Sequence, residues 1–169
     1  MTSRFTWKQI GLAAACALAL WIMSESARSQ TALVLPSAAP VIAKVVLDAD
    51  ALFDFDKAGL NPAGRAALDD FLARLGAITP GMIRLVGHAD RLGSEAHNQV
   101  LSEDRAEAVK DYLVSKGIDP SHVSAKGKGD SQPVTKAGTC NGGRSARVIA
   151  CLQPDRRVAV EVAGTGPIK

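Results

Sequence analysis

Residues 82–93 have the sequence MIRLVGHADRLG, an apolar segment followed by a polar loop between two glycines. The apolar part, residues 82–86, predicts a β-strand. After the loop, the sequence predicts a long helix over residues 94/95–116, which is ended by Gly117. The polar loop between the strand and the helix therefore contains the first candidates for functional residues.

One charged residue of this helix, Arg105, falls within an apolar stripe. At about 100° per residue, its neighbours at i, i+4 spacing are apolar, so Arg105 is expected to face the protein interior. A buried guanidinium without a partner is costly, so a carboxylate from this chain or from a ligand should meet it. The nearest candidate is Asp90 in the preceding loop. The apolar residues of the series are Leu101, Val109 and Leu113.

Two further elements are predicted before the strand. Residues 45–55 predict one extended segment with a bulge at 48–50. A helix follows, because Asn61 can act as its N-cap, Pro62 suits the first helical position, and Gly76 can end it. Between these residues, apolar side chains recur at the three-four spacing of a helix that packs on one side.

Two strands are predicted after the long helix, at residues 122–126 and 157–162, and the second alternates cleanly between polar and apolar residues. The turn-rich residues 127–133 lie between them. Because strands alternate with helices, the sequence predicts an α+β fold in which helices pack on a mixed or mainly parallel sheet.

Length and composition agree with a single folded domain. The chain has 169 residues, and its hydrophobic fraction of 47% is sufficient for a packed core. The formal charge is only +3, from 20 Lys and Arg against 17 Asp and Glu. Nucleic acid is therefore not expected as a partner, because nucleic-acid-binding domains carry strongly basic surfaces.

The N-terminal segment has the layout of a secretory signal peptide, predicted over residues 1–29. Basic residues precede an apolar run at 10–23 that is short for a membrane crossing. Two alternatives remain open: an uncleaved membrane anchor, and a lipoprotein acylated at Cys16. All three export the rest of the chain, and contact with a membrane is expected only through this segment. Residues 30–43, rich in alanine and proline, are predicted to be a tether.

Two cysteines remain in the exported part, Cys140 and Cys151. In an oxidising compartment, a disulfide that closes the loop between them is predicted. Two unrelated buried thiols are the alternative.

Several motifs in a fixed order resemble the OmpA-like peptidoglycan-binding domain family. Together they cover about residues 45–162, nearly the whole exported chain. The resemblance implies one domain at 44–163 with a flexible tail at 164–169. It also implies the order βαβαβ-β, with helices packed on one face of a mixed sheet. The matching segments are residues 52–56, 87–93, 101–109, 112–113, 117–118, 127–129 and 155–158, together with Asn98.

Within the family, the loop between the two cysteines and residues 154–157 are most similar to members whose domain follows a membrane β-barrel. This chain is expected to carry the domain without that barrel. It departs from the common pattern at Ala89, Asp130 and Asp155, where threonine, glutamate and asparagine are usual. An aspartate at position 155 has no amide group with which to donate a hydrogen bond.

The resemblance implies a periplasmic cell-wall receptor that is not an enzyme and uses no cofactor or metal. In that family, an aspartate and an arginine hold the zwitterionic end of meso-diaminopimelate in the peptidoglycan stem peptide, and they fall on Asp90 and Arg105. A carboxylate suits an ammonium, and a planar guanidinium suits a carboxylate. Further contacts are expected from Leu92, Gly93 and Asn98, and at the edge of the site from Asp54 and Arg157.

Three other interpretations remain open. Asp90 and Arg105 could form a permanent structural ion pair. The same domain could belong to a membrane-anchored subunit of an envelope or motor complex, with an envelope protein or a second copy of the chain as partner. A metal-assisted hydrolase is a remote alternative, since His88 and Asp90 could lie on one side of a strand, with His97 as a third residue.

Overall fold

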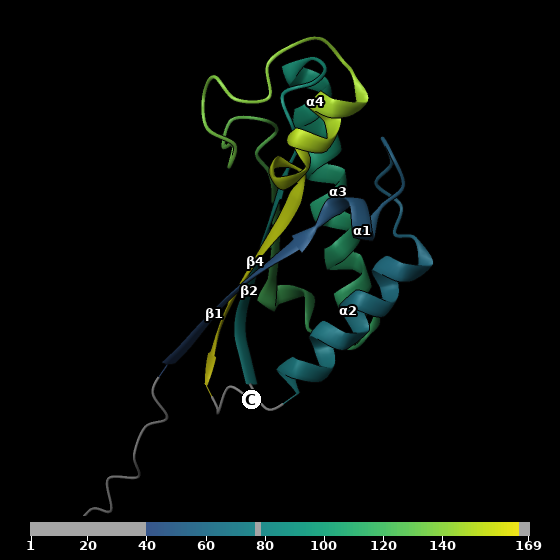
Figure 1. The fold of residues 1–169 in the computed structure, drawn as a ribbon. Helices are drawn as coiled ribbons and strands as arrows, with labels where there is room; N and C mark the ends of the chain where they lie inside the picture. The colour runs from purple at the N-terminus through teal and green to yellow at the C-terminus, as the bar shows by residue number, and fades with distance from the viewer. Residues whose placement is uncertain (1–39, 77–78, 166–169) are drawn as a thin grey trace, which may run out of the picture. The chain divides into compact units, whose positions relative to one another are not determined.

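The computed structural model describes residues 40–76 and 79–165 (Figure 1). The predicted signal peptide, with its anchor and lipoprotein alternatives, lies outside these residues. No helix among the described residues is both long and apolar enough to cross a membrane. The elements are, in chain order, β1 (Pro40–Asp48), α1 (Ala49–Leu52), α2 (Pro62–Leu75), β2 (Thr79–His88), α3 (Glu95–Ser115), η1 (Pro120–His122), β3 (Val123–Gly127), α4 (Ala146–Cys151), η2 (Gln153–Asp155) and β4 (Arg157–Thr165).

The strands form one mixed sheet in the order β1-β4-β2-β3. β2 and β3 are parallel, whereas β4 is antiparallel to both of its neighbours, β1 and β2. Parallel neighbours need a crossover connection, and α3 provides it. The α+β class and the mixed sheet predicted from the sequence are therefore confirmed.

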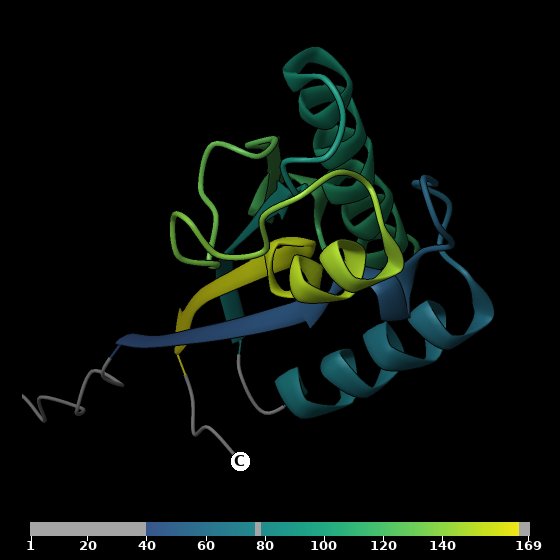
Figure 2. The ribbon, with the colours of Figure 1, turned by 45° about the horizontal axis from the view of Figure 1, so that its top comes forward.

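Helices α2 and α3 pack on one face of the sheet, as two views of the ribbon show (Figures 1 and 2). The alternation along β4 buries Val158, Val160 and Val162 beneath them. This core fixes the position of α3, the helix that carries Arg105. The helices contribute Leu68, Phe71 and Leu75 from α2, and Ala106, Val109 and Leu113 from α3.

The predicted boundaries of α2 and α3 are confirmed to within one residue. The side chain of Asn61 caps α2 by accepting a hydrogen bond from the Gly64 N–H at 2.7 Å. Ser94 caps α3 in the same way, with His97 as donor at 3.2 Å. Beyond α3, Gly117 turns the chain with a φ of +98°, a conformation that favours glycine.

The prediction of one extended segment over residues 45–55 is wrong. β1 ends at Asp48, and α1, a single helical turn, follows at once. Asp48 caps this turn by accepting a hydrogen bond from the Asp50 N–H at 2.9 Å. The turn buries Ala49 and Leu52, whose i, i+3 spacing is that of a helix. The strand-like residues on both sides hide this short helical period in the sequence.

The sheet extends beyond the predicted domain boundaries of 44 and 163. β1 begins at Pro40, inside the predicted tether, and β4 continues to Thr165. These two ends pair with each other. Local composition does not report pairing between distant strands, which is why the proline- and alanine-rich sequence is misleading here.

Asp155, where the family pattern has asparagine, is buried and anchors the loop that precedes the disulfide. Its carboxylate accepts hydrogen bonds from the N–H groups of Val134 and Thr135, at 2.6 and 2.8 Å, and from the Thr135 hydroxyl at 2.6 Å. Burial raises the pKa of Asp155, but the hydrogen bonds outweigh it and hold the pKa below its usual value. The three surrounding groups are all hydrogen-bond donors, so a carboxylate, which only accepts, suits this position.

Candidate functional site

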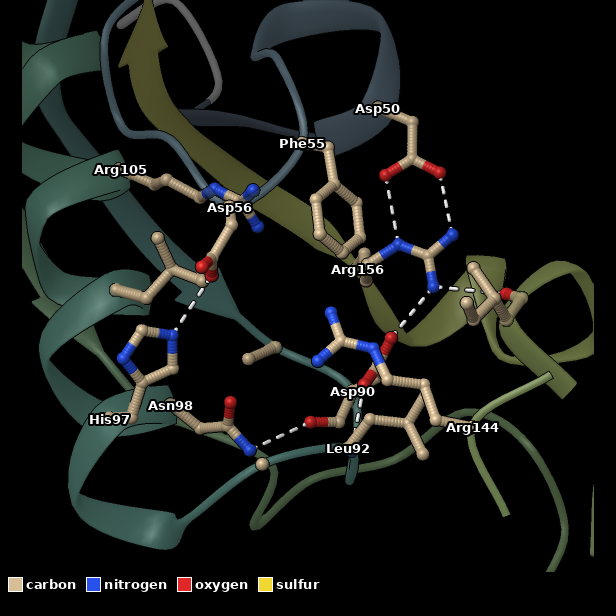
Figure 3. Close-up of a pocket in the computed structure, with 14 residues that line it drawn as sticks. Asp50, Phe55, Asp56, Asp90, Leu92, His97, Asn98, Arg105, Arg144 and Arg156 are labelled. Atoms are coloured by element: carbon tan, nitrogen blue, oxygen red, sulfur yellow. Dashed lines mark hydrogen bonds and ion pairs between the residues drawn. The ribbon is translucent and has the colours of Figure 1, made fainter. Parts of the chain in front are cut away.

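A pocket lies between the end of β2, the start of α3 and the segment after α1 (Figure 3). All five residues that the sequence predicts as ligand contacts line it, namely Asp90, Leu92, Gly93, Asn98 and Arg105. The structure therefore brings the predicted site together, although its residues come from a loop and a helix. The other charged side chains of the lining are Asp50, Asp56, Arg144 and Arg156, beside His97.

Hydrogen bonds within the chain shape the loop after β2. Asp90 Oδ1 accepts a hydrogen bond from the Leu92 N–H at 2.8 Å, and Asn98 Nδ2 donates to the backbone oxygen of Asp90 at 2.9 Å. Gly93, with a φ of +116°, lies against the Asn98 side chain. Asn98 and the Leu92 amide therefore hold Asp90 in position.

The backbones of β2 and α3 touch at Gly87. A Cβ atom on Gly87 would overlap the backbone oxygen of Ser102 and lie 2.9 Å from its carbonyl carbon. No larger residue fits this contact without moving the helix. The close approach sets Asp90, three residues after Gly87, and Arg105, three residues after Ser102, on two walls of one pocket.

Arg105 is 3% exposed, as its position in the apolar stripe predicts. Its Nε donates to the backbone oxygen of Lys57 at 3.0 Å, and its guanidinium lies 5.2 Å from the centre of the Phe53 ring. Neither of its terminal nitrogens has a hydrogen-bond partner among the described residues. Burial lowers the pKa of Arg105, and the nearby aspartates oppose this effect only in part. A desolvated cation with free N–H donors suits a carboxylate ligand.

The ion pair between Asp90 and Arg105 that the sequence suggests is not formed. Asp90 Oδ2 instead lies 2.7 Å from Arg156 Nη1, with only 10% and 11% of the two side chains exposed. The interpretation of Asp90 and Arg105 as a permanent structural bridge is therefore wrong. No carboxylate of the described chain forms an ion pair with Arg105.

Arg156 joins three parts of the pocket wall, and it was not among the site residues predicted from the sequence. Its Nε and Nη2 donate to the two oxygens of Asp50 at 2.8 and 2.6 Å, and its Nη1 also donates to the backbone oxygen of Ile149 at 3.0 Å. The hydrogen bond with Asp50 raises the pKa of Arg156 above its usual value. The alternation of side chains along a strand could have indicated Arg156. Residues two positions apart lie on the same side, so Arg156 is expected on the side of the buried Val158.

The two residues expected at the edge of the site, Asp54 and Arg157, do not line the pocket. Asp54 is exposed and pairs with Lys57 at 3.2 Å. Arg157 donates to two backbone oxygens at 3.0 and 3.2 Å. Their chain neighbours Phe55 and Arg156 line the pocket instead. Phe55 lies in the turn after α1, and Arg156 lies in extended backbone just before β4, where successive side chains point to opposite sides.

The predicted disulfide between Cys140 and Cys151 is present, and the loop that it closes forms one rim of the pocket. Arg91, in the loop after β2, connects the two loops. Its Nη2 donates to the backbone oxygens of Thr139 and Cys140, where the disulfide loop begins. Within it, the Arg144 guanidinium lies 5.3 Å from the centre of the Phe55 ring. The sequence predicts the disulfide but not the place of its loop beside the site.

The geometry does not support a metal-assisted hydrolase. His97 lines the pocket and pairs through Nε2 with Asp56 at 2.9 Å, whereas His88 is buried and is not part of the lining. Within residues 40–76 and 79–165, no group of three or more His, Cys, Asp or Glu side chains could hold a metal ion.

His88 predicts a pH dependence of stability. It is 4% exposed, and burial together with the charges of Arg157 and Lys128 lowers its pKa to about 4, from the usual 6.5. Between these pH values the unfolded chain binds more protons than the folded one. Stability should therefore fall as the pH drops from about 6.5 to about 4, by up to about 3 kcal/mol from this group.

Urea unfolding at pH values above and below this window measures the effect. His88→Gln should lose this part of the pH dependence, whereas His122→Gln, at an exposed histidine, should keep it. The same pH dependence in wild type and His88→Gln would show that His88 does not cause it.

The fold and its pocket define a small α+β domain with a charged pocket beside a mixed sheet. The chain belongs to the OmpA family, whose pattern matches residues 52–147. Outer membrane protein A of Shigella flexneri is 48% identical over 136 residues, which cover 78% of this chain and 39% of that protein. Outer membrane protein A of Escherichia fergusonii is 50% identical over 121 residues, 70% of this chain and 49% of the relative. The chain thus spans half or less of the length of these two relatives.

Solved structures confirm the predicted fold. The OmpA-like domain of FopA1 from Francisella tularensis has a TM-score of 0.55 at 25% identity, and the match covers 77% of each chain. The cell wall anchor of the T6SS from Pseudomonas aeruginosa has a TM-score of 0.59 at 24% identity, covering 75% of this chain and 82% of the other. The OmpA-like α+β fold inferred from the sequence motifs is therefore confirmed, and α1 and α4 are additional to the inferred order βαβαβ-β.

Proposed function

We propose that this chain is a non-enzymatic receptor that binds peptidoglycan without a covalent bond and links the cell envelope to the wall. The proposed ligand group is the free end of meso-diaminopimelate in the stem peptide. One observation carries the proposal: Arg105 is buried, yet its terminal nitrogens have no hydrogen-bond partner among the described residues and the side chain lines a pocket.

The free end of meso-diaminopimelate has one carboxylate and one ammonium group, and the pocket offers a partner for each. Arg105 can bind the carboxylate with two parallel N–H groups. Asp90 can bind the ammonium, because a carboxylate has about four acceptor positions, and Leu92 and Arg156 use only two of them. A lysine side chain has the ammonium but no carboxylate, so it would leave Arg105 without a partner.

Family membership supports a location in the cell envelope. The relatives that share about half of their matched residues with this chain are named for the outer membrane. A disulfide between Cys140 and Cys151 is consistent with the oxidising periplasm. We therefore place the domain in the periplasm, where it can reach the wall.

Calorimetric titration of the full chain tests the proposal. The ligands are a stem tetrapeptide containing meso-diaminopimelate and a matched peptide containing lysine. Wild type should bind only the first, and both Asp90→Asn and Arg105→Ala should weaken binding by about tenfold or more. This is the size expected when a charge-assisted hydrogen bond of about 1.5 to 3 kcal/mol is lost.

The matched control is Asp104→Asn, which makes the same change of charge at an exposed position of α3 and should leave binding unchanged. Circular dichroism should show that all variants are folded. If the folded wild type bound neither peptide, or bound both equally, the proposed recognition of meso-diaminopimelate would be wrong.

A membrane-anchored subunit of an envelope or motor complex would use the same pocket and differ at the N-terminus. That segment lies outside the described residues. The intact mass of the protein from the cell envelope distinguishes cleavage after Ser29, retention of the apolar run at 10–23, and acylation at Cys16.

A further inference from the structure

We propose that Arg144 binds a second carboxylate of the stem peptide at the rim of the pocket. The inference rests on the proposed binding of peptidoglycan and adds a specificity-determining residue beyond Asp90 and Arg105. The ligand would then be recognised by two carboxylates on different residues of the peptide, and not by the diamino acid alone.

Arg144 extends from the disulfide loop into the mouth of the pocket, between Phe55 and Asp90 (Figure 3). Its guanidinium lies 5.3 Å from the centre of the Phe55 ring, and Phe55 is 67% exposed. A cation held over a ring keeps the N–H groups at its edge available. No described residue forms a hydrogen bond or an ion pair with Arg144, so these donors face the open side of the pocket.

None of the three aspartates of the lining forms an ion pair with Arg144. Asp56 forms a hydrogen bond with His97 Nε2 at 2.9 Å, and Asp50 forms an ion pair with Arg156. Asp90, which Arg156 also contacts, is the proposed partner of the ligand ammonium. Once Arg105 takes the carboxylate of the same diamino acid, the remaining cation of the lining without an anionic partner is Arg144.

The loop that carries Arg144 is held in place on the pocket side. The disulfide closes it between Cys140 and Cys151. Arg91 Nη2 donates to the Cys140 backbone oxygen at 2.8 Å, and Arg156 Nη1 donates to the Ile149 backbone oxygen at 3.0 Å. A fixed base reduces the loss of conformational freedom when the side chain binds a ligand.

A stem peptide can supply the second carboxylate in two ways. The glutamate before the diamino acid is linked through its side-chain carboxyl, which leaves its α-carboxylate free. The last residue of the peptide has a terminal carboxylate. Both groups have the same chemistry, and amidation removes the charge of either one separately.

The test compares the full chain with the variant Arg144→Gln by calorimetric titration. The probes are three tetrapeptides containing meso-diaminopimelate: one unmodified, one amidated at the glutamate α-carboxylate, and one amidated at its C-terminus. One of the two amidations should weaken binding to wild type by about threefold to fivefold, the upper part of the range for an exposed ion pair. Arg144→Gln should bind the unmodified peptide as weakly as wild type binds the amidated one, and should not respond to that amidation.

Arg147→Gln is the matched control, because it removes the same charge from an exposed position of the same loop outside the pocket. It should respond to amidation as wild type does. If wild type bound all three peptides equally, or if Arg144→Gln kept the wild-type response, the role of Arg144 would be refuted while the proposed function stood. If folded wild type bound none of the peptides, both proposals would fail.

Discussion

Replacing Arg156 with alanine is expected to lower the free energy of unfolding by about 3 kcal/mol, because removing one partner of a buried ion pair leaves the other uncompensated. The uncompensated group is Asp90, whose side chain is 10% exposed. The variant also loses both hydrogen bonds to Asp50 and the one to the Ile149 backbone oxygen. Thermal unfolding followed by circular dichroism should show a midpoint lower by roughly 10 °C.

The destabilisation should depend on pH. The hydrogen bond from Arg156 holds the pKa of Asp50 below its usual value. A carboxylate with a lowered pKa in the folded state contributes stability above its unfolded pKa, and this contribution disappears as the pH falls through the folded pKa. The difference between wild type and Arg156→Ala should therefore be largest at neutral pH and shrink in acid, below about pH 4.

Two variants serve as comparisons for Arg156→Ala. Arg147→Ala, at an exposed position, should change the free energy of unfolding by less than about 0.5 kcal/mol. Arg156→Lys keeps the charge without the planar two-pronged contact, so it should recover only part of the loss. Equal stability of Arg156→Ala and wild type would show that this network does not support the fold.

Replacing Gly87 with alanine is the second change with a large expected effect. The added Cβ would overlap the Ser102 backbone oxygen, and neither backbone can move without separating β2 from α3. We expect the free energy of unfolding to fall by about 3 kcal/mol or more, at the upper end of the cost of overpacking. Any folded variant should also bind the stem peptide more weakly, because Arg105 lies one helical turn beyond the displaced Ser102.

Gly59→Ala is the matched control for this substitution, since nothing lies within 4 Å of the Cβ that it would add. Its free energy of unfolding should stay within about 0.5 kcal/mol of the wild-type value. Urea unfolding of both variants measures the difference. If Gly87→Ala were as stable as Gly59→Ala, the close contact between β2 and α3 would not constrain the fold.

Local sequence patterns were sufficient for the features that depend on neighbouring residues. The apolar stripe of α3 predicted the burial of Arg105, and Asn61 marked the start of α2. The alternation along β4 predicted its buried valines. The spacing of residues along a helix or a strand decides which side each side chain occupies, so these features are readable without knowing the rest of the fold.

The order of family motifs placed five candidate residues that the structure brings into one pocket. It did not reveal the partner of Asp90. Local spacing placed Arg105 nearest to Asp90, whereas in the folded chain the partner is Arg156, the residue before β4. The motifs also did not show which of two adjacent residues faces the pocket. Asp54 and Arg157 were therefore expected at the site, whereas their chain neighbours Phe55 and Arg156 line it.

Local sequence patterns are enough to predict the class of fold, the inward position of Arg105 and the loop that presents Asp90. The positions of Asp50 and Arg156 in the wall of the pocket, and of Arg144 at its rim, become visible only in the folded chain. These residues come from segments far apart in the chain, which meet because β4 inserts between β1 and β2. Local geometry determines the side on which a residue lies, but strand pairing determines which distant residue it meets.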